Sequence, residues 1–118
     1  MASYSREKLS GSTNGKCVKV AATATAGTLI HTAQSGTTGW DEVYAFVSNT
    51  SGSAVLLTIE FGGTTDPDDL IVKTLSIPAN SPPIPILTGQ MLQNSLVVRA
   101  FASTANVLLV SGYVNRIS

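Results

Sequence analysis

The residues best suited to chemistry in this sequence are a lone histidine and three groups of carboxylates. His31 precedes Asp41 by ten residues and serines are frequent, so a Ser-His-Asp arrangement can be drawn on paper. No serine, however, stands in a turn that resembles the nucleophile elbow of hydrolases. We therefore expect His31 to lie at a strand end, where it faces solvent or a subunit contact.

Three aspartates gather in one loop, at Asp66, Asp68 and Asp69, around Pro67. Clustered loop carboxylates can supply several of the six to eight oxygens that calcium takes. The spacing does not follow an EF-hand loop, and Asp-Pro-Asp is also an ordinary turn sequence in which aspartates accept backbone N–H bonds. We predict a turn here, and neither a metal site nor a cofactor.

Two glutamates, Glu42 and Glu60, fall at similar positions in neighbouring predicted strands. A carboxylate pair about 5–9 Å apart can act in glycoside hydrolysis. On a small sandwich without a cleft, we expect these side chains to be solvated or to meet Lys73 or Arg99 instead. The sequence thus predicts a protein that is not an enzyme.

The charge balance and the lack of a long apolar run each argue against one class of partner. The 118 residues include seven basic and seven acidic side chains, with no basic patch for phosphate contacts, so nucleic acid is not an expected partner. No apolar run approaches the ~20 residues that span a bilayer, so a membrane is not expected either. The single cysteine, Cys17, cannot form an internal disulfide.

The share of charged residues is low, at 12%, whereas typical soluble domains contain about 25%. Serine and threonine supply most of the polarity. Hydroxyl groups lose less than charges do when another chain covers them, and free monomers usually protect open sheet edges with charges. This composition favours a protein in permanent contact with other chains.

Alternating apolar residues predict one all-β domain, without an amphipathic helix longer than a turn or two. The expected strands cover residues 16–24, 28–32, 41–48, 54–61, 70–77, 84–88, 96–102 and 107–114. Because Pro85 cannot donate to a sheet, 84–88 should be an edge or bulged strand. Seven to eight short strands and a proline-rich crossover favour an antiparallel, jelly-roll-like β-sandwich.

The clearest pattern lies at residues 41–61. The segments 41–48 and 54–61 both alternate with a period of two, and the turn residues 49–53 between them predict an antiparallel hairpin. One face of this hairpin is apolar, and much of the other face is apolar as well. A hairpin of this kind requires a sheet under one face and a further contact over the other.

The second face of the hairpin provides candidate interface residues. Tyr44, Phe46 and Leu56 fall on it, and we predict that they pack in an oligomer. Trp40, at the start of the first strand, is a further candidate, either as an interface anchor or as a platform for stacking a sugar.

Residues 1–15 are polar and show no periodic pattern, so we predict an extended N-terminal arm, followed by a single β-sandwich domain over residues 16–118. The arm contains Tyr4 and Leu9, which we predict as anchors on a neighbouring subunit. The alternative is an ordinary frayed terminus.

Four segments, 4–16, 23–44, 59–71 and 108–117, resemble small structural proteins of tailed bacteriophages, of the kind that decorate or cement the capsid. The resemblance spans nearly the whole chain and carries no catalytic signature. It implies a β-sandwich that binds the outside of the shell as a trimer or dimer and bridges neighbouring capsid subunits.

The expected partners are then the major capsid protein and further copies of this chain, with a trimer as the expected oligomer. The expected location is the capsid surface of a virion. The alternative is a carbohydrate- or receptor-binding β-sandwich module of a phage tail or fibre.

Overall fold

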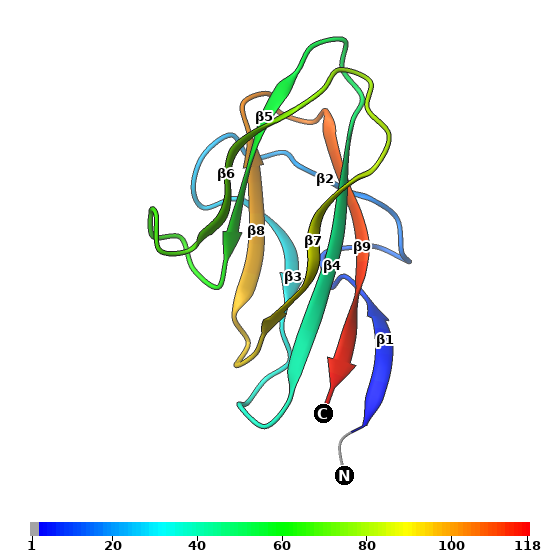
Figure 1. Ribbon diagram of the computed structural model, residues 1–118, viewed down its shortest axis with the longest axis vertical. Coiled ribbons are helices and arrows are strands. Elements are labelled where there is room, and N and C mark those ends of the chain that lie inside the picture. Colours follow the sequence, from blue (N-terminus) through cyan, green and yellow to red (C-terminus); the bar gives the residue numbers. More distant parts are fainter. Residues whose placement is uncertain (1–2) are drawn as a thin grey trace.

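The computed structural model describes residues 3–118, which contain nine strands and no helix (Figure 1). The strands are β1 (Tyr4–Lys8), β2 (Val18–Lys19), β3 (Thr28–Thr32), β4 (Trp40–Asn49), β5 (Val55–Phe61), β6 (Leu70–Ile77), β7 (Ile84–Leu92), β8 (Val97–Ala102) and β9 (Leu108–Ile117). Every pairing is antiparallel. The predicted all-β class and antiparallel sandwich are confirmed. This part of the chain contains no helix that is long and apolar enough to cross a membrane.

The strands form a five-stranded sheet and a four-stranded sheet. The first has the order β1-β9-β4-β7, with β2 also paired to β9, and the second has the order β3-β8-β5-β6. The pairs are nested: β5 pairs with β6, β4 with β7, β3 with β8 and β2 with β9. The chain therefore pairs like one long hairpin that has been rolled up, and its two termini lie at the same end of the molecule (Figure 1).

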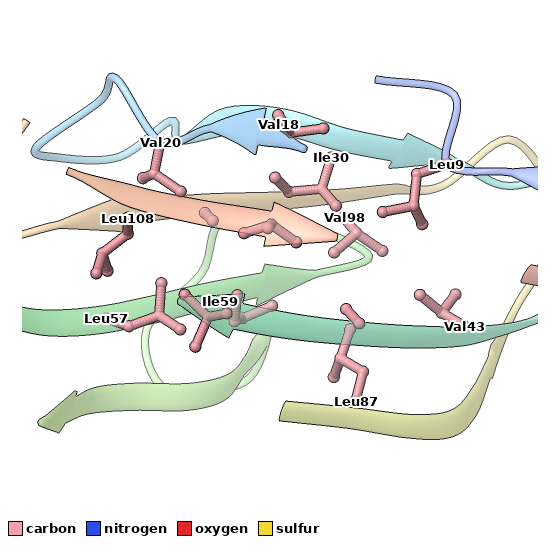
Figure 2. Close-up of a cluster of buried hydrophobic side chains, with 14 of the residues drawn as sticks. Leu9, Val18, Val20, Ile30, Val43, Leu57, Ile59, Leu87, Val98 and Leu108 are labelled. Atoms are coloured by element: carbon pink, nitrogen blue, oxygen red, sulfur yellow. The ribbon is translucent and has the colours of Figure 1, made fainter. Parts of the chain in front are cut away.

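The core lies between the two sheets and consists of aliphatic side chains (Figure 2). Burial alternates along β4, so Val43, Ala45 and Val47 point inward. Leu57 and Ile59 of β5 fill the same layer from the other sheet. No aromatic residue belongs to this buried set in residues 3–118. Among the aromatic residues, Phe61 packs against this core at its margin.

The predicted hairpin at residues 41–61 is wrong, because β4 and β5 lie in different sheets. The turn between them crosses the sandwich. The side-chain amide of Asn49 donates to the carbonyls of Ser53 (2.9 Å) and Ile77 (3.1 Å), and its oxygen accepts the N–H of Ser51 (2.9 Å). The bond to Ile77, at the end of β6, fixes the turn against the four-stranded sheet.

The predicted separate arm is wrong for residues 4–12, which belong to the sandwich. β1 pairs with β9 over its whole length, from Tyr4 opposite Ile117 to Lys8 opposite Tyr113. Leu9 follows β1 and is only 1% exposed. β2 covers the first part of the ten-residue strand β9, and β1 covers its second part. Met1 and Ala2, which the predicted arm includes, lie outside the described residues.

The prediction of an edge or bulged strand at residues 84–88 is confirmed. β7 lies at the edge of the five-stranded sheet, and its register against β4 shifts twice. Pro85 lies opposite Phe46, at an edge position that tolerates the missing N–H. The strand continues to Leu92, so residues 89–92, predicted as a connection, are part of it.

Candidate functional site

None of the seven aromatic residues of the chain is fully buried in the aliphatic core, although Phe61 packs against it. Five of them share one surface, the outer side of the five-stranded sheet. They are Tyr4 of β1, Trp40, Tyr44 and Phe46 of β4, and Tyr113 of β9. Because side chains alternate across a strand, the half-buried positions of β4 must point away from the buried ones. Such a concentration of aromatic residues on one outer face makes this surface a candidate for contact with another chain.

We call this outer surface the aromatic face. It consists of Tyr4, Arg6 and Lys8 of β1, Trp40, Glu42, Tyr44, Phe46 and Ser48 of β4, and Leu109, Ser111, Tyr113, Asn115 and Ile117 of β9. Where β1 covers β9, the register arranges the face in rows, in which one β9 residue lies between one β1 and one β4 residue. The rows are Tyr4–Ile117–Trp40, Arg6–Asn115–Glu42 and Lys8–Tyr113–Tyr44.

The centre of the aromatic face is ordered by stacking. The rings of Tyr44 and Tyr113 are 5.0 Å apart between centroids and inclined by 17°, which is an offset-stacked arrangement. The guanidinium carbon of Arg6 lies 4.6 Å from the centroid of Tyr113, within cation–π distance. A Cβ atom at Gly89 would lie 3.0 Å from the Tyr44 hydroxyl oxygen, so this glycine leaves room for the ring. These contacts within the chain hold the side chains of Tyr44, Tyr113 and Arg6 in place.

A hollow of about 390 Å³ continues the aromatic face beyond β4. Its lining residues are Trp40, Met91, Leu92, Gln93 and Leu96. The amide nitrogen of Gln93 already donates to the carbonyls of Thr37 and Gly39. With few polar groups left to orient a ligand, the hollow suits an apolar or aromatic side chain better than a sugar.

One buried polar atom on the aromatic face, within residues 3–118, lacks a hydrogen-bond partner. Asn115 is only 8% exposed, and its Oδ1 is the one buried side-chain nitrogen or oxygen atom without a partner in residues 3–118. A buried acceptor without a donor is destabilising by about 1–3 kcal/mol, so native structures rarely contain one.

The six predicted interface residues do not form one surface. Four of them lie together on the aromatic face, namely Tyr4, Trp40, Tyr44 and Phe46. Leu56 is exposed on the four-stranded sheet, and Leu9 lies in the core of its own subunit. The prediction for Leu9 is wrong, because this side chain packs within its own chain. Leu56 remains a predicted contact residue, but on a different surface, because the sequence does not reveal which strands become neighbours.

Sequence reasoning missed the contributions of β1 and β9 to this face, namely Arg6, Tyr113, Asn115 and Ile117. A usable signal was present in the last strand. Val110 and Val114 are both buried, so odd-numbered positions between and beyond them belong to the outer side. This alternation continues past residue 114, where the predicted strand ended.

His31 is 1% exposed, so the expectation that it faces solvent or a subunit contact is wrong. A register shift between Leu29 and His31 turns the ring inward. Its Nε2 lies 2.7 Å from Asp41 Oδ2, and its Nδ1 accepts the backbone N–H of Ser10 at 3.0 Å. The Ser10 hydroxyl accepts the N–H of Thr32 instead of contacting the ring. The histidine is thus not part of a Ser-His-Asp triad.

Asp41 is the centre of this buried network. Arg116 Nε donates to its Oδ1 and the Arg116 terminal nitrogen to its Oδ2, each at 2.9 Å, in a bidentate pair. The backbone N–H of Gln34 donates to Oδ2 as well, at 3.2 Å. The network joins β3, β4 and β9 to the segment that follows β1. It fastens both ends of the chain to the sandwich.

The environment of the network shifts two pKa values downward. Burial lowers the pKa of His31, and this outweighs the opposing effect of Asp41. Burial raises the pKa of the Asp41 carboxyl, but the hydrogen bonds from Arg116 and His31 outweigh burial, so its pKa lies below the ordinary value. At neutral pH the network consists of a neutral histidine, a carboxylate and a guanidinium.

These shifts predict that stability falls as the pH is lowered. Below pH 6.5 the unfolded chain binds a proton at His31 that the folded chain does not, and below about pH 4 the same holds for Asp41. One such proton changes the free energy of unfolding by at most about 1.4 kcal/mol per pH unit. Urea unfolding between pH 4 and pH 8 measures this slope. The His31→Gln variant, which can still bond Asp41 and Ser10, should show a flatter profile between pH 5 and 7. An equal slope in both proteins would contradict the assignment to His31.

The aspartate cluster forms the predicted turn. Asp69 Oδ2 accepts the N–H of Thr65 at 3.0 Å, and the N–H of Leu70 donates to the carbonyl of Pro67 at 3.1 Å. Asp66 pairs with Lys73 at 3.0 Å, and both side chains are exposed. These interactions are those of a solvated surface turn.

The two glutamates are not neighbours, so the predicted pairing of their positions is wrong. Glu42 belongs to the aromatic face, whereas Glu60 is buried on the four-stranded sheet. Glu60 accepts the N–H of Gly27 at 2.7 Å and the hydroxyl of Thr25. It is neither solvated nor paired with Lys73, and Arg99 beside it donates to the Gly27 carbonyl.

The chain matches no protein-family model, no curated protein and no solved structure with which it was compared.

Proposed function

We propose that this protein is a structural subunit that works by contact, as a decoration or cement protein on the capsid of a tailed bacteriophage. The observation that carries the proposal is the aromatic face, where five of seven aromatic residues meet on the outer side of one sheet. A subunit that functioned alone would have little reason to keep these residues outside its core.

The low charge of the chain supports the same proposal. Charged residues make up 12% of the sequence, and hydroxyl-bearing strands can be covered at small desolvation cost. Each copy would add buried area across a joint between capsid proteins, where a typical specific interface buries ~1,600 Å². An oligomer that engages several joints at once gains further affinity from its effective concentration.

The nested strand pairs support a finer assignment of the sandwich to the jelly-roll class. In that class two Greek keys form two packed sheets of four strands. Here β2-β9-β4-β7 faces β3-β8-β5-β6, and β1 adds an extra edge segment beside β9. A scaffold of this kind presents one outer sheet face as a flat contact surface.

The second candidate function is a carbohydrate- or receptor-binding module of a phage tail or fibre. The feature that favours it is Trp40 itself, because an indole ring can stack on a sugar. A glycan array would support this alternative only through a hit that Trp40→Ala abolishes and Leu56→Ala, on the other sheet, preserves.

The proposed function is tested on particles. Virions assembled with and without this protein should differ by density on the outer capsid surface in cryo-electron microscopy. Virions without it should also release DNA at a lower temperature, because fewer contacts resist internal pressure. Density confined to the tail, or unchanged particles, would contradict the proposal.

A further inference from the structure

We propose that two copies of this chain pair through their aromatic faces, about a two-fold axis that runs parallel to β9. The inference deepens the proposed function, on which it rests, by naming the oligomer and its contact. It also replaces the expected trimer with a dimer.

The direction of the axis follows from the arrangement of the face. Two identical faces that pack against each other have their two-fold axis in the plane between them, and the contact is then self-complementary. An axis along β9 places β9 of one copy over β9 of the other, and β1 of each copy over β4 of the other. Rotation about this axis does not change the position of a residue along β9. Each row of one copy therefore faces the same row of the other copy.

The charged row is complementary under this axis. Arg6 and Glu42 lie on opposite sides of Asn115, each about 5 Å away, the spacing between neighbouring strands. The axis brings Arg6 of each copy to Glu42 of the other. An axis perpendicular to β9 would instead bring Arg6 to Arg6 and Glu42 to Glu42, which like charges disfavour.

The two rows beside it are complementary in the same way. Tyr4 is 62% exposed, and the axis places it against Trp40 of the second copy. Trp40 lines the apolar hollow, so Tyr4 lies beside that hollow. Lys8 comes to the stacked ring of Tyr44, at which a cation is favourable. The most exposed aromatic residue of the chain thus gains a pocket.

The axis also supplies the donor that Asn115 lacks. Asn115 is in the central column of the face, so the axis places it opposite Asn115 of the second copy. Its Oδ1 has no partner within its own chain. The amide nitrogen of the second copy can donate to it, and the reverse bond forms equally. A paired asparagine at a two-fold axis also fixes the register of the two chains.

The size of the face is adequate for such a dimer. β4 and β9 each have ten residues, so the face is about 34 Å long and, over the three strands that this axis superposes, about 14 Å wide. Covering roughly 480 Å² on each copy buries about 1,000 Å² in total, which is at the lower end of specific interfaces.

Charge reversal tests the pairing. Arg6→Glu and Glu42→Arg should each weaken self-association about a hundredfold, because each creates two like-charge contacts in the dimer. Light scattering and sedimentation velocity at micromolar concentration should show a wild-type dimer and monomeric single variants. An equimolar mixture of the two variants should form a one-to-one dimer, and the double variant should dimerise again. Lys73→Glu, on the other sheet, is the matched control and should remain a dimer.

A second variant tests the axis itself. Asn115→Asp keeps the shape of the side chain but places two carboxylates opposite each other, so self-association at pH 7 should weaken at least tenfold. Circular dichroism shows whether each variant remains folded. A wild-type monomer or trimer, no rescue in the mixture, or full association of Asn115→Asp would overturn the dimer. None of these results changes whether virions carry outer density, so the two proposals fail separately.

Discussion

Replacing Asp41 with alanine should lower the free energy of unfolding by about 3 kcal/mol, the lower end of the range for breaking a buried ion pair, because Arg116 is one-third exposed and water can solvate it in the variant. Asp41 is fully buried and accepts hydrogen bonds from Arg116, His31 and Gln34. In the variant these donors lose their common acceptor inside the protein. Since the free energy of unfolding of such domains is about 5–15 kcal/mol, this loss is a large fraction of it. Urea unfolding at pH 7 measures the difference.

The chain contains a matched control for this experiment. Asp66 pairs with Lys73 at 3.0 Å, but both side chains are exposed. Surface pairs of this kind contribute about 0–1 kcal/mol, so Asp66→Ala should have little effect. Equal losses in Asp41→Ala and Asp66→Ala would show that the buried network does not hold the terminal strands.

The existence of most strands could be predicted from the sequence, but their neighbours could not. The strands at residues 28–32 and 70–77 were correctly predicted because alternation and punctuating residues such as Gly27 and Pro78 bound them locally. The turn at residues 49–53 is compatible both with a hairpin and with a crossing between sheets. The bond that decides between them, from Asn49 to the Ile77 carbonyl, joins residues 28 apart in sequence. No local pattern contains that information.

The candidate site shows the same division between local and distant information. The outward direction of Tyr44 and Phe46 could be predicted, since both are out of phase with the valines of β4. The pattern also held an unused signal: Asp41 is in phase with the buried Val43, so a buried charge with a partner was to be expected. Arg116 could not be matched to it from sequence, because β9 becomes the neighbour of β4 only in the folded sheet.

Replacing Leu9 with alanine should lower the free energy of unfolding by about 2–5 kcal/mol, the usual effect of shortening a buried leucine. Leu9 is 1% exposed and packs in the core of its own chain. The next residue, Ser10, donates its N–H to His31, so the same segment also supports the buried network. An arm anchored on a neighbour would have no such effect on an isolated subunit. Chemical unfolding at protein concentrations below the dissociation constant of the dimer therefore distinguishes a segment packed in its own chain from an arm anchored on a neighbour.

Tyr4→Ala is the natural comparison, because Tyr4 comes from the same segment but is largely exposed. Its loss should change the stability of the single subunit by no more than about 0.5 kcal/mol, as is usual for surface substitutions, and should weaken self-association instead. The two variants are thus expected to affect different quantities. Leu9→Ala should lower the free energy of unfolding of a single chain, whereas Tyr4→Ala should weaken the association of two chains. If the Leu9→Ala variant were as stable as the wild type, the N-terminal segment would not pack in the sandwich of its own chain. β1 could then not contribute Arg6 to the aromatic face of that chain, as the two-fold pairing requires.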